Sequence, residues 1–256
     1  MTSPGPIPLS DALRDDAARR YREVRARIDR AARRAGRDPG AITLVGVAKR
    51  QPLDRILATL EAGLRVLGEN FVQEARETRD RLESELAARE HALPAPPLEW
   101  RMVGRLQRNK LAEAVRLFDA IESVDRAELV APLAKRAAEA GRVLDLLVQI
   151  NVGDEPQKGG CSFGDAPALL RQVAAEPSLQ LRGLMAVPPA SEDPEASRPY
   201  FQRLRAARDE WAREIPALAD GDLSIGMSHD FEVAIEEGAT LVRVGTALFG
   251  PRIDPR

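Results

Sequence analysis

Apolar side chains recur every three or four positions between Leu9 and Arg37, which is the spacing of one face of an α-helix. The stripe consists of Leu13, Ala17, Tyr21, Val24, Ile28 and Ala31. Ser10 can cap the start of this helix, and Gly36 with Pro39 can end it. We therefore expect a long amphipathic helix that docks on the rest of the molecule through its apolar face.

After Pro39 the pattern changes to short apolar, β-branched runs that alternate with stretches of helical periodicity. The expected strands are 42–48, 65–67, 99–103, 120–124, 143–150, 181–187, 222–225 and 240–244. The expected helices between them are 53–62, 72–88, 110–117, 126–140, 166–175, 195–215 and 231–237. Such alternation is typical of parallel strands joined by right-handed crossovers. Eight units in roughly 210 residues favour an α/β fold of the (β/α)8 TIM barrel type over its alternative, a doubly wound open sheet.

The chain is expected to form one domain over residues 1–256, with the helix of residues 1–37 packed on the barrel. Two proline-rich segments, 91–98 and 188–199, are expected to be surface loops. Neither segment is long enough to separate two domains.

Composition excludes several classes of protein. The formal net charge of −2 disfavours a dedicated nucleic-acid binder. Apolar runs are too short to cross a membrane, and the N-terminus does not resemble a signal peptide. The single cysteine, Cys161, and two histidines provide little for a disulfide or a metal site. We therefore expect a cytoplasmic protein without a metal, and a monomer, because no exposed apolar stripe requires a partner.

The polar face of the N-terminal helix carries ten arginines and five acidic residues between Leu9 and Arg37. Such a face can bind nucleic acid or an anionic membrane. A solvated face on a docking helix is the more ordinary interpretation.

Lys49 is the strongest single candidate for a reactive residue, because barrel enzymes place their reactive groups at the carboxyl ends of strands. It follows the apolar run 42–48, and the chain has 34 arginines but only four lysines. An amine that is desolvated there can attack a carbonyl group and form a Schiff base. The alternative is a lysine that snorkels to the rim and pairs with an acidic residue.

Two glycine-containing turns follow the seventh and eighth strands. Gly226, Met227 and Ser228 form the first turn, and Gly245 with Thr246 begins the second. Glycine lets backbone N–H groups approach an anion closely, and the hydroxyl groups add donors, so the pair predicts a phosphate site. The alternative is that Ser228 only caps the next helix and Gly245 only turns the chain.

Three further polar residues lie near the same end of the strands. Strand alternation lets Arg243 point into the barrel, where it needs an acceptor, either a ligand or a carboxylate such as Glu69 or Asp145. Asn70 can bind a ligand or cap the following helix. Lys158 is either a solvated charge or a group that reaches over the mouth.

Six segments in this order resemble the pyridoxal phosphate homeostasis protein family, which is related to the barrel domain of alanine racemase. They are LVGVAKRQP at 44–52, GENFVQEA at 68–75, WRMVGRLQRNK at 100–110, LVQINVGDEPQKGG at 147–160, LRGLMAVPP at 181–189 and LSIGMSHDFEVAIEEGATLVRVGTALFG at 223–250. The resemblance covers nearly the whole chain, and its last segment is long and specific.

The resemblance implies that Lys49 holds pyridoxal 5′-phosphate as an aldimine, with Asn70 near the ring and Arg243 near the pyridine nitrogen. The phosphate would be held by Gly226, Met227, Ser228, Gly245 and Thr246. Arginine cannot give its proton to the ring nitrogen, so carbanion chemistry would be weakly supported. The implied function is a non-enzymatic role in vitamin B6 homeostasis, with PLP-dependent apoenzymes as recipients of the cofactor. The alternative is a PLP-dependent racemase or lyase on the same site.

The chain departs from the family pattern at several positions. Gln51 stands where many relatives have a second lysine, which puts in doubt a transfer route through neighbouring amines. Lys158 is then the remaining candidate for such a route. The third-strand motif also departs from the pattern. Many relatives have residues other than arginine at the positions of Arg101, Arg105 and Arg108.

Overall fold

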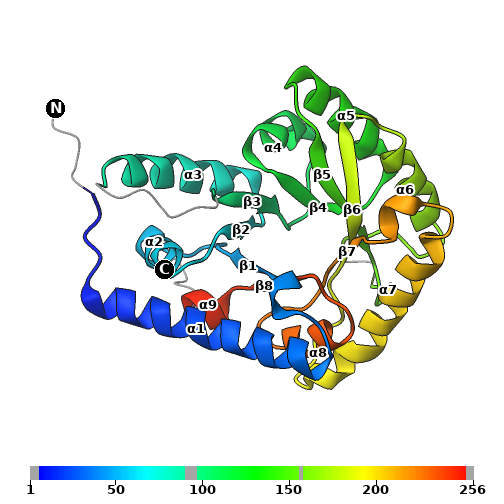
Figure 1. Ribbon diagram of the computed structural model, residues 1–256. Coiled ribbons are helices and arrows are strands. Elements are labelled where there is room, and N and C mark those ends of the chain that lie inside the picture. Colours follow the sequence, from blue (N-terminus) through cyan, green and yellow to red (C-terminus); the bar gives the residue numbers. More distant parts are fainter. Residues whose placement is uncertain (1–5, 90–96, 156–157, 252–256) are drawn as a thin grey trace.

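Eight parallel strands close into a barrel in chain order, and the helices that connect them form an outer layer (Figure 1). The structure is a computed structural model that describes residues 6–89, 97–155 and 158–251. The strands are β1 (Thr43–Val47), β2 (Val66–Glu69), β3 (Glu99–Met102), β4 (Ala120–Val124), β5 (Leu144–Ile150), β6 (Leu179–Ala186), β7 (Asp222–Ser224) and β8 (Leu241–Val244). The α-helices are α1 (Asp11–Arg34), α2 (Leu53–Glu61), α3 (Val72–Ala87), α4 (Leu111–Leu117), α5 (Val130–Glu139), α6 (Ala166–Ala174), α7 (Arg198–Trp211), α8 (Phe231–Glu236) and α9 (Thr246–Phe249).

Pairing between the first and last strands closes the sheet. It runs in register from Thr43↔Leu241 to Gly46↔Val244. The predicted (β/α)8 barrel is therefore confirmed, and the alternative of an open doubly wound sheet is wrong. An open sheet would leave the edges of β1 and β8 without these backbone hydrogen bonds.

Some predicted boundaries differ from the structure. The helix expected over 195–215 consists of a 3-10 turn (Pro194–Ser197) followed by α7, so part of the loop expected over 188–199 is helical. The other expected loop, 91–98, lies mostly outside the described residues. The one-turn helix α9 was not predicted from the sequence.

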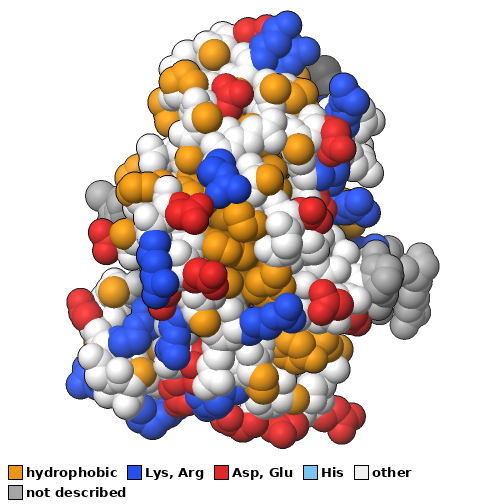
Figure 2. Space-filling view, turned by 90° about the vertical axis from the view of Figure 1, so that its right-hand side faces the viewer, with side chains coloured by type: hydrophobic (Ala, Val, Ile, Leu, Met, Phe, Trp, Pro, Cys, Tyr) orange, Lys and Arg blue, Asp and Glu red, His pale blue; other side chains and the backbone are white. Residues whose placement is uncertain are grey.

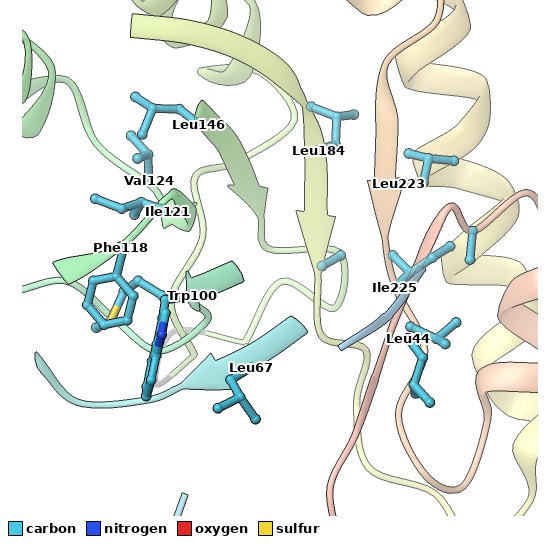
Figure 3. Close-up of a cluster of buried hydrophobic side chains, with 14 of the residues drawn as sticks. Leu44, Leu67, Trp100, Phe118, Ile121, Val124, Leu146, Leu184, Leu223 and Ile225 are labelled. Carbon is cyan, nitrogen blue, oxygen red and sulfur yellow. The ribbon is translucent and has the colours of Figure 1, made fainter. Parts of the chain in front are cut away.

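Outward-facing apolar residues of the strands pack against the helical layer and form the main core (Figure 3). Leu44, Leu67, Trp100, Ile121, Leu146, Leu184 and Leu223 belong to it. Gly46 allows a close approach between the barrel and this layer, because a Cβ atom at this position would lie 2.5 Å from Leu64 Cδ2. Burial of these side chains from water is the principal stabilising contribution to the barrel.

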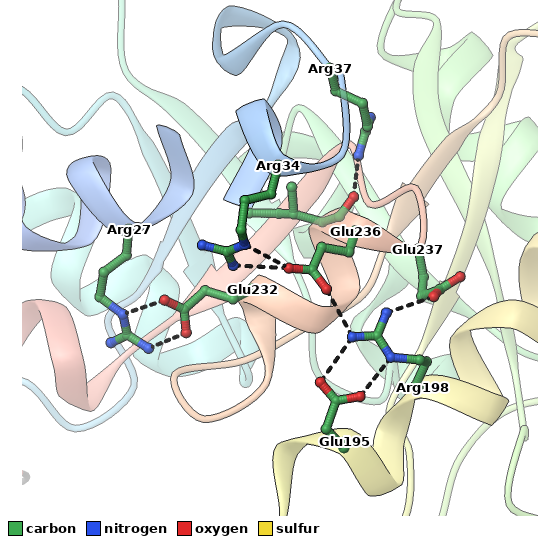
Figure 4. A network of polar contacts seen from close by, with 9 residues as sticks. Arg27, Arg34, Arg37, Glu195, Arg198, Glu232, Glu236 and Glu237 are labelled. Carbon is green, nitrogen blue, oxygen red and sulfur yellow. Dashed lines mark hydrogen bonds and ion pairs between the residues drawn. The ribbon is translucent and has the colours of Figure 1, made fainter. Parts of the chain in front are cut away.

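The N-terminal helix α1 docks as its pattern predicts. Val24, Ile28 and Ala31 are buried, and α1 packs against α2, α8 and α9. Arg27 and Arg34 pair with Glu232 and Glu236 of α8 at 2.8 and 2.9 Å (Figure 4). Several arginines of this face therefore hold the helix in place.

A third arginine extends that network to α7. Arg198 pairs with Glu195, Glu236 and Glu237, so α8 is linked on one side to α1 and on the other to α7 (Figure 4). Hydrogen bonds from Arg198 lower the pKa of Glu236, and Arg34 adds to that effect.

Charges of both signs are interspersed on the face seen in Figure 2, around a small apolar area. Ion pairs such as Arg171–Glu214 at 3.1 Å and Arg203–Asp154 at 3.7 Å involve α6 and α7. Within the described ranges, no helix has the length and apolar character that spanning a membrane requires.

Candidate functional site

Lys49 lies in the turn that follows β1, at the carboxyl end of the barrel. The turn is held by a hydrogen bond from the Gln51 backbone N–H to the Ala48 carbonyl at 2.8 Å, and Arg50 adopts a φ of 54°. The Lys49 side chain is half-buried, and its Nζ lies 5.0 Å from the centroid of the Phe71 ring. The amine therefore faces an aromatic surface and is less desolvated than the sequence interpretation assumed.

Lys49 differs from the other lysines in its partners. The other three each lie within 4 Å of a carboxylate, in the pairs Lys110–Glu113, Lys135–Glu139 and Lys158–Glu155. Lys49 has no such ion pair with any of the described residues. No described acidic residue therefore supplies the rim partner that the alternative interpretation requires.

The turns after β7 and β8 are joined through Ser228. Its hydroxyl oxygen accepts hydrogen bonds from the backbone N–H groups of Gly245 at 3.3 Å and Ala247 at 3.4 Å. Gly226 has a φ of +88°, and a Cβ atom there would lie 2.6 Å from Ala234 Cβ, so only glycine fits this turn. The two turns predicted from the sequence therefore form one connected structure.

Ser228 does not cap the next helix, so that sequence interpretation is wrong. The N-cap residue of α8 is Asp230. The Asp230 carboxylate also accepts a hydrogen bond from the Met227 backbone N–H at 2.7 Å and one from Ser197 Oγ at 2.8 Å. This Met227 N–H is consequently engaged within the protein, whereas the Met227 side chain is exposed.

Arg243 points into the barrel below these turns. Its Nη1 donates to the Ser224 carbonyl at 2.6 Å and to Ser224 Oγ at 2.7 Å, and Nη2 donates to the Ala186 carbonyl at 2.9 Å. Burial lowers the pKa of Arg243, and the carboxylates of Glu122 and Asp230 oppose that effect. Both terminal nitrogens are thus fixed, while Nε has no hydrogen bond with the described residues.

The carboxylates suggested as partners of Arg243 lie elsewhere. Glu69 shares the outward face of β2 with Leu67, which packs in the main core. Asp145 lies near the start of β5, where it pairs with Arg182 at 2.9 Å. Neither reaches Arg243, so this part of the sequence interpretation is wrong.

Sequence reasoning missed the carboxylate that does stand inside the barrel. Glu122 of β4 is fully buried, pairs with Arg101 at 3.1 Å and accepts a hydrogen bond from Ser224 Oγ at 2.5 Å. Arg101, Glu122, Ser224 and Arg243 therefore form a continuous polar network across the barrel interior. A charged residue within the apolar run 120–124 was the signal that could have revealed it.

Asn70 and Glu69 follow one another at the end of β2 but face different surroundings. Asn70 is half-buried at the mouth, and its side chain forms no hydrogen bond with the described residues. The N-cap residue of α3 is Phe71, so the alternative of Asn70 as a helix cap is wrong. Burial raises the pKa of the Glu69 carboxyl from 4.5 to about 8, and the charge of Glu74 adds to this effect.

Lys158 is held by contacts within the protein, and Cys161 is unreactive. Lys158 Nζ donates to the Pro188 carbonyl at 2.9 Å, beside the end of β6, in addition to its ion pair with Glu155. Burial raises the pKa of the Cys161 thiol to about 12, which makes it a poor nucleophile.

This chain is similar to known proteins over nearly its whole length. Residues 20–253 match the family model of the alanine racemase N-terminal domain. A pyridoxal phosphate homeostasis protein of Aquifex aeolicus is 42% identical over 237 residues, which cover 93% of this chain and 99% of that protein.

Solved structures agree with the sequence matches. An unknown protein from Bifidobacterium adolescentis has a TM-score of 0.85 at 32% identity, over 94% of this chain and 97% of that chain. PipY of Synechococcus elongatus, in a structure with PLP bound, has a TM-score of 0.77 at 34% identity, over 91% of this chain and 100% of that chain.

The closed barrel, with a lysine after its first strand and linked glycine turns after its last two, is of the alanine racemase N-terminal type. Proteins of this type differ in what they do, so the fold alone does not fix a function. Within the class, the chain belongs to the pyridoxal phosphate homeostasis protein family. The resemblance recognised in the sequence is thereby confirmed.

Proposed function

We propose that this chain binds pyridoxal 5′-phosphate at the barrel mouth, with Lys49 as the covalent anchor, and acts in PLP homeostasis without turning over a substrate. The observation that carries the proposal is the environment of Lys49. It is the one lysine that has no carboxylate partner among the described residues, and it stands at the mouth of the barrel. The PLP-bound structure of PipY, a protein 34% identical to this chain, supports the same ligand.

The residues present fit such a ligand. The backbone N–H groups of Ser228 and Thr246 have no acceptor among the described residues, and the Ser228 hydroxyl lies beside them. A Cβ atom at Gly245 would lie 3.4 Å from the Val47 carbonyl oxygen, which is an ordinary van der Waals distance. The space beside Gly245 is therefore open. These groups, with Gly226, would hold the phosphate.

Strand register brings the proposed anchor and phosphate site to the same end of the barrel. Gly46 of β1 pairs with Val244 of β8. Lys49 comes shortly after Gly46 and Gly245 directly after Val244, so both residues lie at the carboxyl ends of these two neighbouring strands. The backbone N–H of Arg243 donates to the Gly226 carbonyl at 2.9 Å, which joins the turn after β7 to β8. Asn70 would then lie on the β2 side of the ring.

Arg243 supports a role without turnover. When bound, pyridoxal phosphate supplies an aldehyde that condenses with amines and a ring that can withdraw electrons. Nε is the one guanidinium nitrogen of Arg243 without a hydrogen bond to the described residues, and a guanidinium does not give its proton to a pyridine nitrogen. An unprotonated ring withdraws electrons poorly, so this chain would hold the cofactor and give weak support to reactions of bound amino acids.

Spectroscopy tests the proposed site. Titration of the purified protein with pyridoxal phosphate should produce the longer-wavelength absorbance that accompanies bond formation with an amine. The Lys49→Ala variant should lose this change, whereas the matched Lys135→Ala variant, altered on the exposed side of α5, should retain it. Absence of the change in the unaltered protein at saturating cofactor would contradict the proposal.

A turnover assay tests the absence of catalysis. The loaded protein should convert L-alanine, D-alanine or L-serine no faster than free pyridoxal phosphate does. Sustained conversion that disappears in Lys49→Ala would instead establish a racemase or lyase. Activation of a PLP-dependent apoenzyme by the loaded protein, faster than by an equal concentration of free cofactor, would support delivery to such recipients.

A further inference from the structure

A groove of about 800 Å³ lies beside Lys49, between the loops that follow β2 and β3. We call it the Arg105 groove; residues 70–71, residues 104–109 and Arg126 line it. Its walls are packed closely, because a Cβ atom at Gly104 would lie 2.2 Å from the Asn70 carbonyl oxygen. The Gly104 carbonyl also accepts a hydrogen bond from Ser123 Oγ at 2.6 Å. The groove is therefore a formed feature of the fold.

The Arg105 groove has an excess of positive charge. Arg105, Arg108 and Arg126 line it, and no acidic residue is among the described residues of its lining. The carboxylate that contacts Arg105, Asp125, is buried and already paired with Arg126, and it reaches Arg105 only at 3.8 Å. Arg108 is exposed and has no ion pair with the described residues. Two guanidinium groups thus remain available to an anion.

Several arginines elsewhere on the surface pair with carboxylates of neighbouring elements. Arg27, Arg34 and Arg198 each lie within 3 Å of a carboxylate on another helix or turn. The side chain of Arg105 is 68% exposed, with only that long contact to Asp125. Close structural pairing therefore accounts for those three arginines but not for Arg105 and Arg108.

An exposed aromatic ring completes the groove. Phe71 is 47% exposed, and its ring contacts Lys49 on one side. The uncharged amides of Asn70, Gln107 and Asn109 lie around it. Aromatic rings stack on such a surface, and arginines bind phosphate groups by charge-assisted hydrogen bonds.

We infer that the Arg105 groove binds a phosphorylated aromatic compound without a covalent bond, with its ring on Phe71 and its phosphate between Arg105 and Arg108. The volume suits one small molecule, since ligand pockets span roughly 300–1,000 Å³. The ring and phosphate could come from a nucleotide or from a phosphorylated pyridine. The inference does not depend on a bond to Lys49, because none of the groups it uses is an amine.

Calorimetry with four probes distinguishes the two sources. AMP and ATP represent nucleotides, pyridoxine 5′-phosphate represents a phosphorylated pyridine without an aldehyde, and inorganic phosphate lacks a ring. The test compares the unaltered full-length protein with Arg105→Ala/Arg108→Ala and with Phe71→Ala. The matched control is Arg22→Ala/Arg33→Ala, which removes two exposed arginines of α1.

At least one of the aromatic phosphates should bind, and tighter binding of AMP or of pyridoxine phosphate identifies the source. Arg105→Ala/Arg108→Ala should weaken this binding by roughly tenfold or more, whereas the control should leave it unchanged. Phe71→Ala should weaken the binding of the aromatic phosphates by about tenfold and leave the binding of inorganic phosphate unchanged. Thermal unfolding of each variant shows that the fold is retained.

Four results would overturn the inference. The first is no binding of any aromatic phosphate at millimolar concentration. The second is binding that Ser228→Ala weakens and Arg105→Ala/Arg108→Ala does not, which would place the ligand at the turns after β7 and β8. The third is inorganic phosphate binding as tightly as the aromatic probes. The fourth is tight binding of single-stranded RNA that mononucleotides do not compete.

Discussion

Replacement of Glu69 by glutamine should make the protein more stable at alkaline pH. The Glu69 side chain is 1% exposed, and its Oε2 has no hydrogen-bond partner among the residues that the structure describes. In the folded protein, burial raises the pKa of the Glu69 carboxyl from 4.5 to about 8, and the nearby charge of Glu74 adds to this increase. The folded protein therefore retains a proton that the unfolded chain releases between these values.

The sign and size of the effect follow from proton linkage. Because the folded state binds more protons, the free energy of unfolding falls as pH rises between about 4.5 and 8. At about 1.36 kcal/mol for each unit of pKa, Glu69 costs at most about 5 kcal/mol above pH 8. Glutamine carries no charge, so this loss is absent in Glu69→Gln.

Urea unfolding between pH 5 and pH 8 measures the effect. The stability advantage of Glu69→Gln over the unaltered protein should grow by about 1.4 kcal/mol for each pH unit. The matched control is Glu77→Gln, an exposed residue of the same helix α3 as Glu74, and it should show no such slope. Parallel pH profiles for Glu69→Gln and the unaltered protein would refute the reasoning.

Four further substitutions test other parts of the account. Ile28→Ala removes a fully buried side chain of α1 and should lower the free energy of unfolding by about 2–5 kcal/mol in urea titrations. Glu122→Ala leaves Arg101 and Arg243 without their buried carboxylate and should cost about 3–5 kcal/mol, measured in the same way. Gly226→Ala should lower the thermal midpoint, because a side chain there meets α8 at a positive φ. Ser228→Ala should weaken pyridoxal phosphate binding by about tenfold in equilibrium dialysis, with little effect on binding of unphosphorylated pyridoxal.

Local periodicity predicted most of the elements, whereas closure into a barrel was inferred only from the number of strand–helix units. The stripe through Val24 and Ile28 identified α1, and the β-branched runs identified the strands. Pairing of Thr43 with Leu241 joins residues almost two hundred positions apart, so no local pattern reveals it. The one-turn helix α9 is too short to display a helical period.

The sequence predicted where the candidate residues lie in the fold better than it predicted what they contact. Lys49, Ser228 and Gly245 lie at the carboxyl ends of strands as expected, because parallel strands bring these ends together. The acceptors of Arg243 could not be predicted, since alternation gives the face of a strand and not the opposite partner across the barrel. Ser228 resembled a helix cap, but α8 begins after Asp230, and the Ser228 hydroxyl instead accepts hydrogen bonds from the turn after β8.

Borohydride reduction of the protein loaded with pyridoxal phosphate, followed by peptide mass spectrometry, tests the central claim most directly. We expect a stable phosphopyridoxyl group on the peptide that contains Lys49 and none on peptides that contain the ion-paired lysines. A label found mainly on Lys110, Lys135 or Lys158, or no label at saturating cofactor, would contradict it.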